Sequence, residues 1–254
     1  MRFASLGSGS GGNATLICCG DTRLLIDCGF GVREAERRLA RLDVGAETLS
    51  AVLVTHEHSD HIKGVGAFAR KHGTPVYMTS GTWVSRNYGR IPELHLIENY
   101  QPFRVGTIDV QPVAVPHDAR EPAQYVISGN GRRLGVLTDL GSVTPHVVDA
   151  YRHCDSLLVE ANHDPAMLAA GPYPPSLKAR VASPWGHLSN QQTAGLLQQL
   201  ELGRLQHLVV GHISRKNNSL SRAADALQTV FAGIAGNSIL YACQDEGFDW
   251  LHIN

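Results

Sequence analysis

The stretch VLVTHEHSDHIKG, residues 52–64, concentrates side chains that are able to bind a metal ion. Six consecutive positions within it hold three histidines and an aspartate: His56, His58, Asp60 and His61. Neutral imidazole and carboxylate are the usual protein ligands of divalent transition metals. A helix cap would account for Asp60 alone and leaves three histidines unexplained. The spacing therefore predicts a metal site.

The residues on either side of this stretch predict the elements that position it. Residues 49–55, LSAVLVT, form a continuous apolar run that is typical of a strand buried on both faces. The run leads into His56 and His58, which are two residues apart and point to the same side in extended backbone. Residues 61–73 predict a helix that ends in a glycine. The metal site is thus expected where a strand meets a helix.

Strand signals occur along the chain in two blocks, and helical segments accompany both. The first block opens with a hairpin formed by residues 13–20 and 22–29. Helices are expected over residues 31–42, 189–200 and 220–233. Residues 169–177 are expected to be irregular. Two blocks of strands with accompanying helices predict a layered fold, with two sheets inside and helices outside, in a single domain over residues 1–254.

A glycine-rich stretch at residues 7–13, GSGSGGN, matches the G-x-G-x-x-G pattern of dinucleotide-binding folds. In those folds the pattern opens a helix whose N-terminus meets a pyrophosphate, whereas here it leads into a strand. A dinucleotide fold is therefore not expected. The loop from Ser8 to Asn13 either presents backbone N–H groups to a phosphate or is a simple glycine-rich turn.

The composition indicates a globular chain without a strong charge bias. Its 254 residues are 43% hydrophobic, its formal net charge is -1 and its pI is about 6.9. Any surface that attracts phosphate must therefore be local. The five cysteines are odd in number and lack a C-x-x-C pair, so buried thiols are expected rather than disulfides. No signal-peptide segment or apolar run of roughly 18 residues is present, which predicts a soluble cytoplasmic protein without membrane contact.

The segment THEHSDH, residues 55–61, resembles the H-x-H-x-D-H motif of the metallo-β-lactamase fold, an α+β four-layer αββα sandwich of metal-dependent hydrolases. The resemblance implies three further ligands, each after an apolar strand: His117 in VAVPHDA, Asp139 in GVLTDLG and His212 in LVVGHIS. Singly, each has an ordinary interpretation as a residue at a strand end. Their occurrence in the expected order favours ligands. Asp27 in LLIDCG also matches a family signature, in which the aspartate supports the site.

By this resemblance the centre holds two divalent cations. One is bound by three histidines, the other by an aspartate and two histidines, and one aspartate bridges them: His56, His58 and His117; Asp60, His61 and His212; Asp139. Histidine and aspartate ligands suit zinc, manganese or iron. Two such cations can share a hydroxide that is available as a nucleophile at neutral pH. Asp60 is expected both to bind metal and to orient this hydroxide.

His187, in the segment GHLSN, is the expected partner of the leaving group. It precedes a helix start whose backbone N–H groups can meet an anion, and it resembles the H-S-T segment of the phosphodiesterase branch of the fold, including ribonuclease Z. That branch also has an H-E-A-T motif whose histidine protonates the leaving oxygen. The matching stretch LVEANHD keeps Glu160 but has Val159 in place of the histidine. Two candidates for the general acid therefore remain open, His163 and His187.

Over nearly the whole chain the sequence is similar to the YycJ (WalJ) type of metallo-β-lactamase-fold hydrolase. The shared segments include SLGSGSGGNATL, THEHSDHIKG, VPHDA and GHISRKNNS. The resemblance implies a phosphodiesterase, most specifically a DNA exonuclease that acts from 5′ ends. Four basic residues flank the expected ligands and are candidates for contacts to a phosphate backbone: Lys178, Arg180, Arg215 and Lys216. An ordinary solvated charge distribution explains them about equally well.

Two other classes of function stay open. A thioester or lactone hydrolase of the same fold would have a C-terminal substrate clamp, which is not recognised here. A non-catalytic metal-binding module would have lost ligands, whereas all seven are present. No long insertion that could form a tRNA-binding arm lies between Asp139 and His212. The sequence leaves open the metal identity, the polarity of cleavage and the oligomeric state.

Overall fold

The computed structural model describes residues 1–231 and 238–254, which fall into two compact units. The first unit comprises Met1–Ala114, Ala119–Arg132 and Cys243–Asn254, and the second comprises Val115–Asp118 and Arg133–Ala242. A single domain over residues 1–254 stays a prediction. No helix in the described part of the chain is long and apolar enough to cross a membrane.

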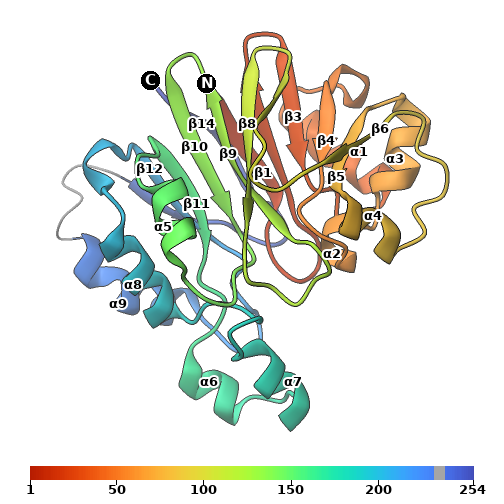
Figure 1. Ribbon diagram of the computed structural model, residues 1–254. Coiled ribbons are helices and arrows are strands. Elements are labelled where there is room, and N and C mark those ends of the chain that lie inside the picture. Colours follow the sequence, from red (N-terminus) through yellow and green to blue (C-terminus); the bar gives the residue numbers. More distant parts are fainter. Residues whose placement is uncertain (232–237) are drawn as a thin grey trace. The chain divides into compact units, whose positions relative to one another are not determined.

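A mixed seven-stranded sheet lies in the first unit, with the order β14-β1-β2-β3-β4-β5-β6 (Figure 1). Its strands are β1 Arg2–Gly7, β2 Ala14–Cys19, β3 Thr22–Ile26, β4 Ala51–Leu53, β5 Val76–Thr79, β6 Leu94–Ile97 and β14 Phe248–His252. β2 and β3 pair antiparallel, which confirms the predicted hairpin, and Gly20 takes the left-handed conformation in its turn (φ 57°). From β3 to β6 the strands are parallel.

The helices of the first unit are α1 Val32–Arg41, α2 Ser59–Ile62, α3 Val65–His72 and α4 Ser80–Ser85, with a 3-10 turn η1 at Ala46–Thr48. α1 and α3 bury side chains such as Leu39 and Phe68 in one core with Leu16 and Val52 from the sheet. Burial of a leucine or phenylalanine side chain contributes about 1.5–3 kcal/mol. This core holds the segment between β4 and α3, which carries the first histidine cluster, against the sheet.

The single helix predicted over residues 61–73 is in fact two helices, α2 and α3. The interruption is at Gly64, because a Cβ there would lie 2.0 Å from the carbonyl oxygen of Phe30. The chain can pass so close to this backbone only without a side chain. The predicted end at Gly73 is confirmed, since this glycine caps α3 with φ 69°.

The second sheet has the order β13-β12-β11-β10-β9-β8-β7. Its strands are β7 Phe103–Val105, β8 Ile108–Ala114, β9 Ala123–Gly129, β10 Arg132–Leu137, β11 Ser156–Glu160, β12 His207–Gly211 and β13 Ser238–Tyr241. In the second unit β10 to β13 run parallel. Every residue of β11 is buried, as expected of a strand covered on both faces. The carboxyl ends of these strands lie at one edge, where site residues of α/β proteins gather.

The helices of the second unit are α5 Pro145–Tyr151, α6 Pro165–Ala170, α7 Pro175–Val181, α8 Asn190–Gln199 and α9 Leu220–Phe231, with a 3-10 turn η2 at Leu202–Arg204. α8 and α9 lie side by side (Figure 1). The irregular stretch predicted at residues 169–177 is wrong in part, because α6 ends and α7 begins within it. Proline is favourable at the first position of a helix, and both helices begin with one. The last two residues of the helix predicted over 220–233 lie outside the described residues.

Candidate metal centre

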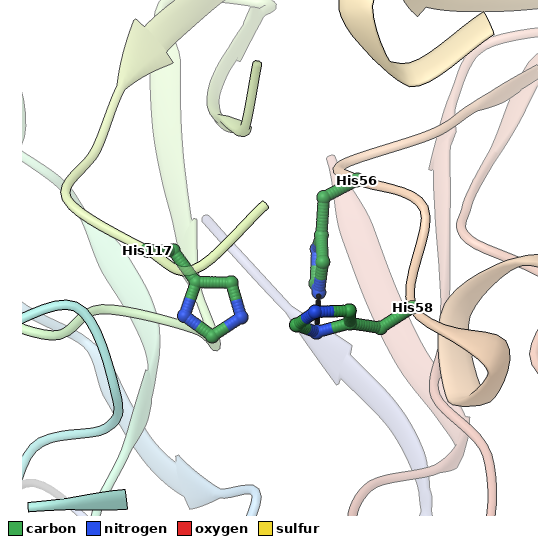
Figure 2. A group of neighbouring side chains, drawn as sticks. All are labelled: His56, His58 and His117. Carbon is green, nitrogen blue, oxygen red and sulfur yellow. Dashed lines mark hydrogen bonds between the residues drawn. The ribbon is translucent and has the colours of Figure 1, made fainter. Parts of the chain in front are cut away.

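The first cluster of candidate ligands lies in the first unit, in the segment that links β4 to α2. His56 and His58 turn their rings toward each other at an interplanar angle of 81°, and His56 Nε2 lies 3.0 Å from His58 Nδ1 (Figure 2). Two nitrogens that bind one zinc ion at about 2.05 Å in tetrahedral geometry lie about 3.3 Å apart. The pair therefore has the spacing of two ligands of one ion. The two side chains lie on the same side of the segment, as their spacing predicts, and their role as metal ligands stays a prediction.

Asp27 orients the histidine at the buried end of this cluster. Its Oδ2 lies 2.8 Å from His61 Nδ1, and its two oxygens accept hydrogen bonds from the Thr55 N–H (2.8 Å) and hydroxyl (2.9 Å). Burial raises the pKa of Asp27, and the adjacent His61 opposes that shift. An aspartate that accepts the Nδ1 proton leaves the imidazole lone pair on Nε2, which is the usual arrangement behind a metal-binding histidine.

Asn13 contacts two of the candidate ligands, and the sequence patterns did not single it out. Its Nδ2 lies 3.1 Å from His61 Nε2 and 3.2 Å from Asp60 Oδ2, and these two ligand atoms are 3.5 Å apart. Its Oδ1 accepts a hydrogen bond from the Gly9 N–H at 2.8 Å. The glycine-rich stretch therefore delivers an amide to the ligand cluster. The available signal was the position of Asn13 at the end of that stretch, directly before a buried strand.

The second cluster lies in the second unit and gathers three strand-end residues that were predicted as ligands. Asp139 Oδ1 lies 3.1 Å from His212 Nδ1 and 3.8 Å from His117 Nε2. Asp139 follows β10, His212 follows β12, and His117, which is drawn in Figure 2, lies on the loop after β8. His212 has a positive φ of 48°, which is rare outside glycine and is found preferentially at functional sites.

Backbone carbonyls hold two histidines of this second cluster. His117 Nδ1 lies 2.9 Å from the Gly186 oxygen, and His212 Nδ1 lies 2.8 Å from the Thr138 oxygen. A carbonyl only accepts hydrogen bonds, so each Nδ1 carries the proton and each Nε2 carries the lone pair. Both side chains are almost completely buried. The fold therefore fixes both rings in this orientation before any ligand binds, so that binding costs little further conformational entropy.

His187 and Glu160 form a pair beside this cluster. His187 Nδ1 lies 2.9 Å from Glu160 Oε2, and Asp139 Oδ1 is 3.7 Å from the same nitrogen. Glu160 is fully buried, and its Oε1 accepts hydrogen bonds from the N–H groups of Leu140 (2.7 Å) and Leu188 (3.2 Å). Burial raises the pKa of Glu160, and the adjacent His187 opposes that shift. His187 keeps a partly exposed ring, whereas Glu160 has no access to solvent.

His163, the other candidate general acid, has a different environment. Its side chain is 3% exposed, and its Nδ1 has no hydrogen-bond partner among the described residues. Burial, with the nearby His187 adding to it, lowers the pKa of His163 to about 4. Its backbone instead anchors the start of α8, because its carbonyl accepts the Asn190 N–H at 2.9 Å. Ser189 is the N-cap of α8 and forms a capping box with Gln192 at that helix start.

The four basic residues proposed to contact phosphate lie in the second unit. Lys178 donates from Nζ to the Ala169 carbonyl at 2.6 Å, and Arg180 forms an ion pair with Asp118. Lys216 Nζ lies 5.8 Å from the ring centre of Tyr173, and Arg215 is exposed. Their role in binding substrate stays a prediction.

The donor chemistry of both clusters fits divalent metal ions. In the second unit, Asp139 with His117 and His187 offers three ligand atoms within 4.8 Å of one another, as do Glu160, His187 and His212. Cysteine takes no part, and the buried thiols of Cys28 and Cys154 have their pKa raised to about 12 by burial. Oxygen and imidazole ligands without thiolate are compatible with zinc, manganese and iron.

Two mixed sheets with flanking helices, and histidine and aspartate clusters at strand ends, define a metal-dependent hydrolase of the metallo-β-lactamase fold. The family model of the beta-lactamase superfamily domain matches residues 22–213, and the chain belongs to this family. It is 34% identical over 224 residues to the exodeoxyribonuclease YycJ of Bacillus anthracis, covering 86% of this chain and 84% of the relative. It is 35% identical to the exodeoxyribonuclease WalJ of Streptococcus pneumoniae, covering 86% and 83%.

A solved structure supports the same fold. The metallo-beta-lactamase fold protein YhfI from Bacillus subtilis matches with a TM-score of 0.76 and 17% identity, covering 98% of each chain. At this identity the likeness concerns the fold alone. The predicted α+β fold class is confirmed by this structure and the family model, and the resemblance to the YycJ (WalJ) family is confirmed by the two exodeoxyribonuclease relatives.

Proposed function

We propose that this chain is a metal-dependent phosphodiesterase that acts on nucleic acid, and most specifically a 5′ to 3′ DNA exonuclease. The observation that carries the proposal is the pair of Glu160 and His187 beside Asp139. A buried carboxylate that orients an imidazole next to metal ligands is suited to delivering a proton to a poor leaving group, such as the alkoxide of a phosphodiester. The names of the relatives, both exodeoxyribonucleases, support DNA as the substrate.

The metal ligands of the proposal are the seven residues expected from the sequence. His56, His58 and His117 would hold one divalent ion, Asp60, His61 and His212 a second, and Asp139 would bridge them. Zinc, manganese and iron are the candidate metals. Divalent ions of this kind supply Lewis acidity toward phosphoryl oxygens and lower the pKa of water toward neutrality. The chain itself fixes the orientation of three of these ligands: Asp27 holds His61, Gly186 holds His117 and Thr138 holds His212.

His187 serves as the general acid in this proposal. Its Nδ1 proton is held by Glu160, so protonation of the ring at Nε2 places the transferable proton on the opposite side from the carboxylate. His163 has no such acceptor, and its pKa of about 4 keeps it neutral at pH 7. His187 is therefore the better of the two candidates left open by the sequence.

Asp60 orients the attacking water in the same proposal. Its carboxylate receives a hydrogen bond from Asn13 Nδ2, which fixes Oδ2 on the side of His61. A carboxylate held in this way offers its remaining lone pairs to water from a fixed position. Holding a nucleophile in a near-attack geometry lowers the barrier by several kcal/mol.

The test incubates purified, manganese-loaded protein with 5′-labelled and 3′-labelled duplex DNA, beside Asp60→Ala and His187→Ala variants. We expect digestion by the wild type and a loss of roughly 10²-fold or more in rate for each variant. The two labels report the direction of cleavage. Absence of digestion, or an unchanged rate for Asp60→Ala, argues against the proposal.

Two small substrates, assayed in parallel, distinguish a phosphodiesterase from a thioester hydrolase of the same fold. Bis(p-nitrophenyl) phosphate reports phosphodiester cleavage without any need for a strand-binding surface, and a thioester reports the alternative chemistry. Cleavage of the thioester but not of the phosphodiester would identify a thioester hydrolase. Metal content, measured on the same samples, shows that each variant has been compared at equal loading.

A further inference from the structure

A surface cavity of about 420 Å³ lies in the first unit, beside the element that carries the first ligand cluster. Its lining comes from α2, α3 and the segment that follows α4, and we call it the basic cavity. The residues of its lining that matter here are Ser59, Lys63, Arg70, Arg86, Asn87 and Tyr88. None of them belongs to the predicted set of ligands or phosphate contacts.

The basic cavity has three positive side chains and no carboxylate in its lining. Lys63 and Arg86 form no ion pair with any described residue. Some cations of the first unit are neutralised by a neighbouring carboxylate: Arg37 pairs with Glu34 at 2.6 Å and Lys71 with Glu36 at 2.6 Å. The chain as a whole is nearly neutral, so this concentration of positive charge is local. Such a field attracts a polyanion over roughly one Debye length, about 10 Å.

The wall of the basic cavity is preformed. Arg70 Nη1 donates to the carbonyl oxygens of Tyr88 (2.8 Å) and Arg90 (3.0 Å), which ties the segment after α4 to α3 without neutralising the guanidinium. A Cβ at Gly66 would lie 2.0 Å from the Tyr88 oxygen, so the close approach of this segment requires glycine. Because these parts are already ordered, little conformational entropy is lost when an anion binds.

We propose that the basic cavity binds the phosphate backbone of the strand on which the metal centre acts, an inference that rests on the proposed function. Ser59 lines the cavity and adjoins Asp60, so a strand held at the first ligand cluster continues directly onto Lys63 and Arg86. Tyr88 supplies the only ring among the described lining residues and is itself 7% exposed. With no exposed ring for base stacking, the contacts are to phosphates and are independent of base sequence.

The test measures DNA binding in the presence of EDTA, so that its readout does not depend on a metal-loaded enzyme. A fluorescently labelled single strand is titrated with wild type, with Lys63→Gln/Arg86→Gln, and with a control, Arg33→Gln/Arg37→Gln. The control removes the same formal charge from exposed positions on α1 that do not line the cavity. Circular dichroism and the thermal midpoint verify that all three proteins are folded.

Neutralising a phosphate contact on a single strand contributes about 0.7 to the slope of log Kobs against log salt. The cavity variant is therefore expected to lose about 1.4 from this slope and roughly tenfold or more in affinity at low salt, while the control keeps the slope of wild type. Equal slopes for the cavity variant and the control would overturn the inference, and so would absence of binding by wild type at low salt.

The same samples distinguish failure of this inference from failure of the proposed function. Manganese-loaded wild type is assayed on bis(p-nitrophenyl) phosphate, which is too small to need the basic cavity. If this compound is cleaved and the two variants bind DNA equally, the proposed phosphodiesterase activity is supported and the proposed role of the basic cavity is rejected. If the compound is not cleaved and only the cavity variant binds DNA more weakly, the nucleic-acid-binding role of the basic cavity is supported and the proposed phosphodiesterase activity is rejected.

Discussion

His187 Nδ1 lies 2.9 Å from Oε2 of Glu160, a carboxylate that has no contact with solvent. The other oxygen of Glu160 receives two backbone N–H groups, so the carboxylate cannot rotate away from the imidazole. Burial without a charged partner would cost a carboxylate several kcal/mol. The hydrogen bond with the His187 imidazole offsets part of this cost. The same hydrogen bond fixes the orientation of the ring.

The first prediction concerns this pair. Glu160→Gln keeps the acceptor for Leu140 and Leu188 but removes the carboxylate oxygen that accepts the Nδ1 proton of His187. We expect kcat on bis(p-nitrophenyl) phosphate to fall by roughly 10²-fold, because an amide nitrogen at this place cannot accept that proton and the ring loses its orientation. An unchanged kcat in a folded Glu160→Gln variant of equal metal content would contradict the role given to this pair.

The second prediction concerns Asp27, which accepts the Nδ1 proton of His61. Asp27→Asn can still accept that hydrogen bond but without its charge, and we expect metal affinity to fall by about 10–100-fold. Competition with a chelator measures the affinity directly. Asp21→Asn serves as the control, because Asp21 lies in the turn of the same hairpin. We expect this variant to bind metal with the affinity of wild type. Equal affinities for the two variants would contradict the role given to Asp27.

The third prediction is a dependence of stability on pH. His163 has a pKa of about 4 in the folded chain and of about 6.5 when unfolded, so between these values only the unfolded state takes up the proton. The contribution of His163 to the free energy of unfolding is therefore complete above pH 6.5 and is lost as the pH falls toward 4. From pH 7 to pH 5 this group should remove about 2 kcal/mol from the free energy of unfolding.

Urea unfolding in EDTA at the two pH values measures this loss. Between pH 7 and pH 5, the free energy of unfolding of His163→Gln should fall by about 2 kcal/mol less than that of wild type. His95→Gln is the matched control, because that imidazole is 42% exposed and lies on β6 of the first unit. A His163 variant with the pH dependence of wild type would mean that the imidazole is not held neutral by burial.

The fourth prediction concerns Gly64, where the chain between α2 and α3 passes over the Phe30 carbonyl. Gly64→Ala places a methyl group 2.0 Å from that oxygen, and we expect a loss of roughly 2 kcal/mol or more in the free energy of unfolding. Gly195→Ala in α8 meets no atom within 4 Å and should stabilise by up to about 1 kcal/mol. Denaturant unfolding compares the two, and equal effects would contradict the contact at Gly64.

Local patterns explain why much of the fold was predictable. Apolar runs that end at His56, Asp139 and His212 predicted three buried strands, because a strand covered on both faces needs continuous hydrophobic residues. The start of the helix predicted over residues 189–200 agrees with the structure, in which Ser189 caps α8. By contrast α4 and α5 were not expected. Each is short, and neither has an amphipathic repeat long enough to detect.

The sequence by itself determined which atoms are able to bind metal and at which strand ends they stand, because ligand chemistry and strand periodicity are properties of short segments. Only the tertiary structure decided the partners. Asn13 meets Asp60 across 47 positions, and Glu160 meets His187 across 27. The basic cavity likewise joins α2 and α3 to the segment after α4. Such contacts depend on how strands pair and helices pack, which no local pattern encodes.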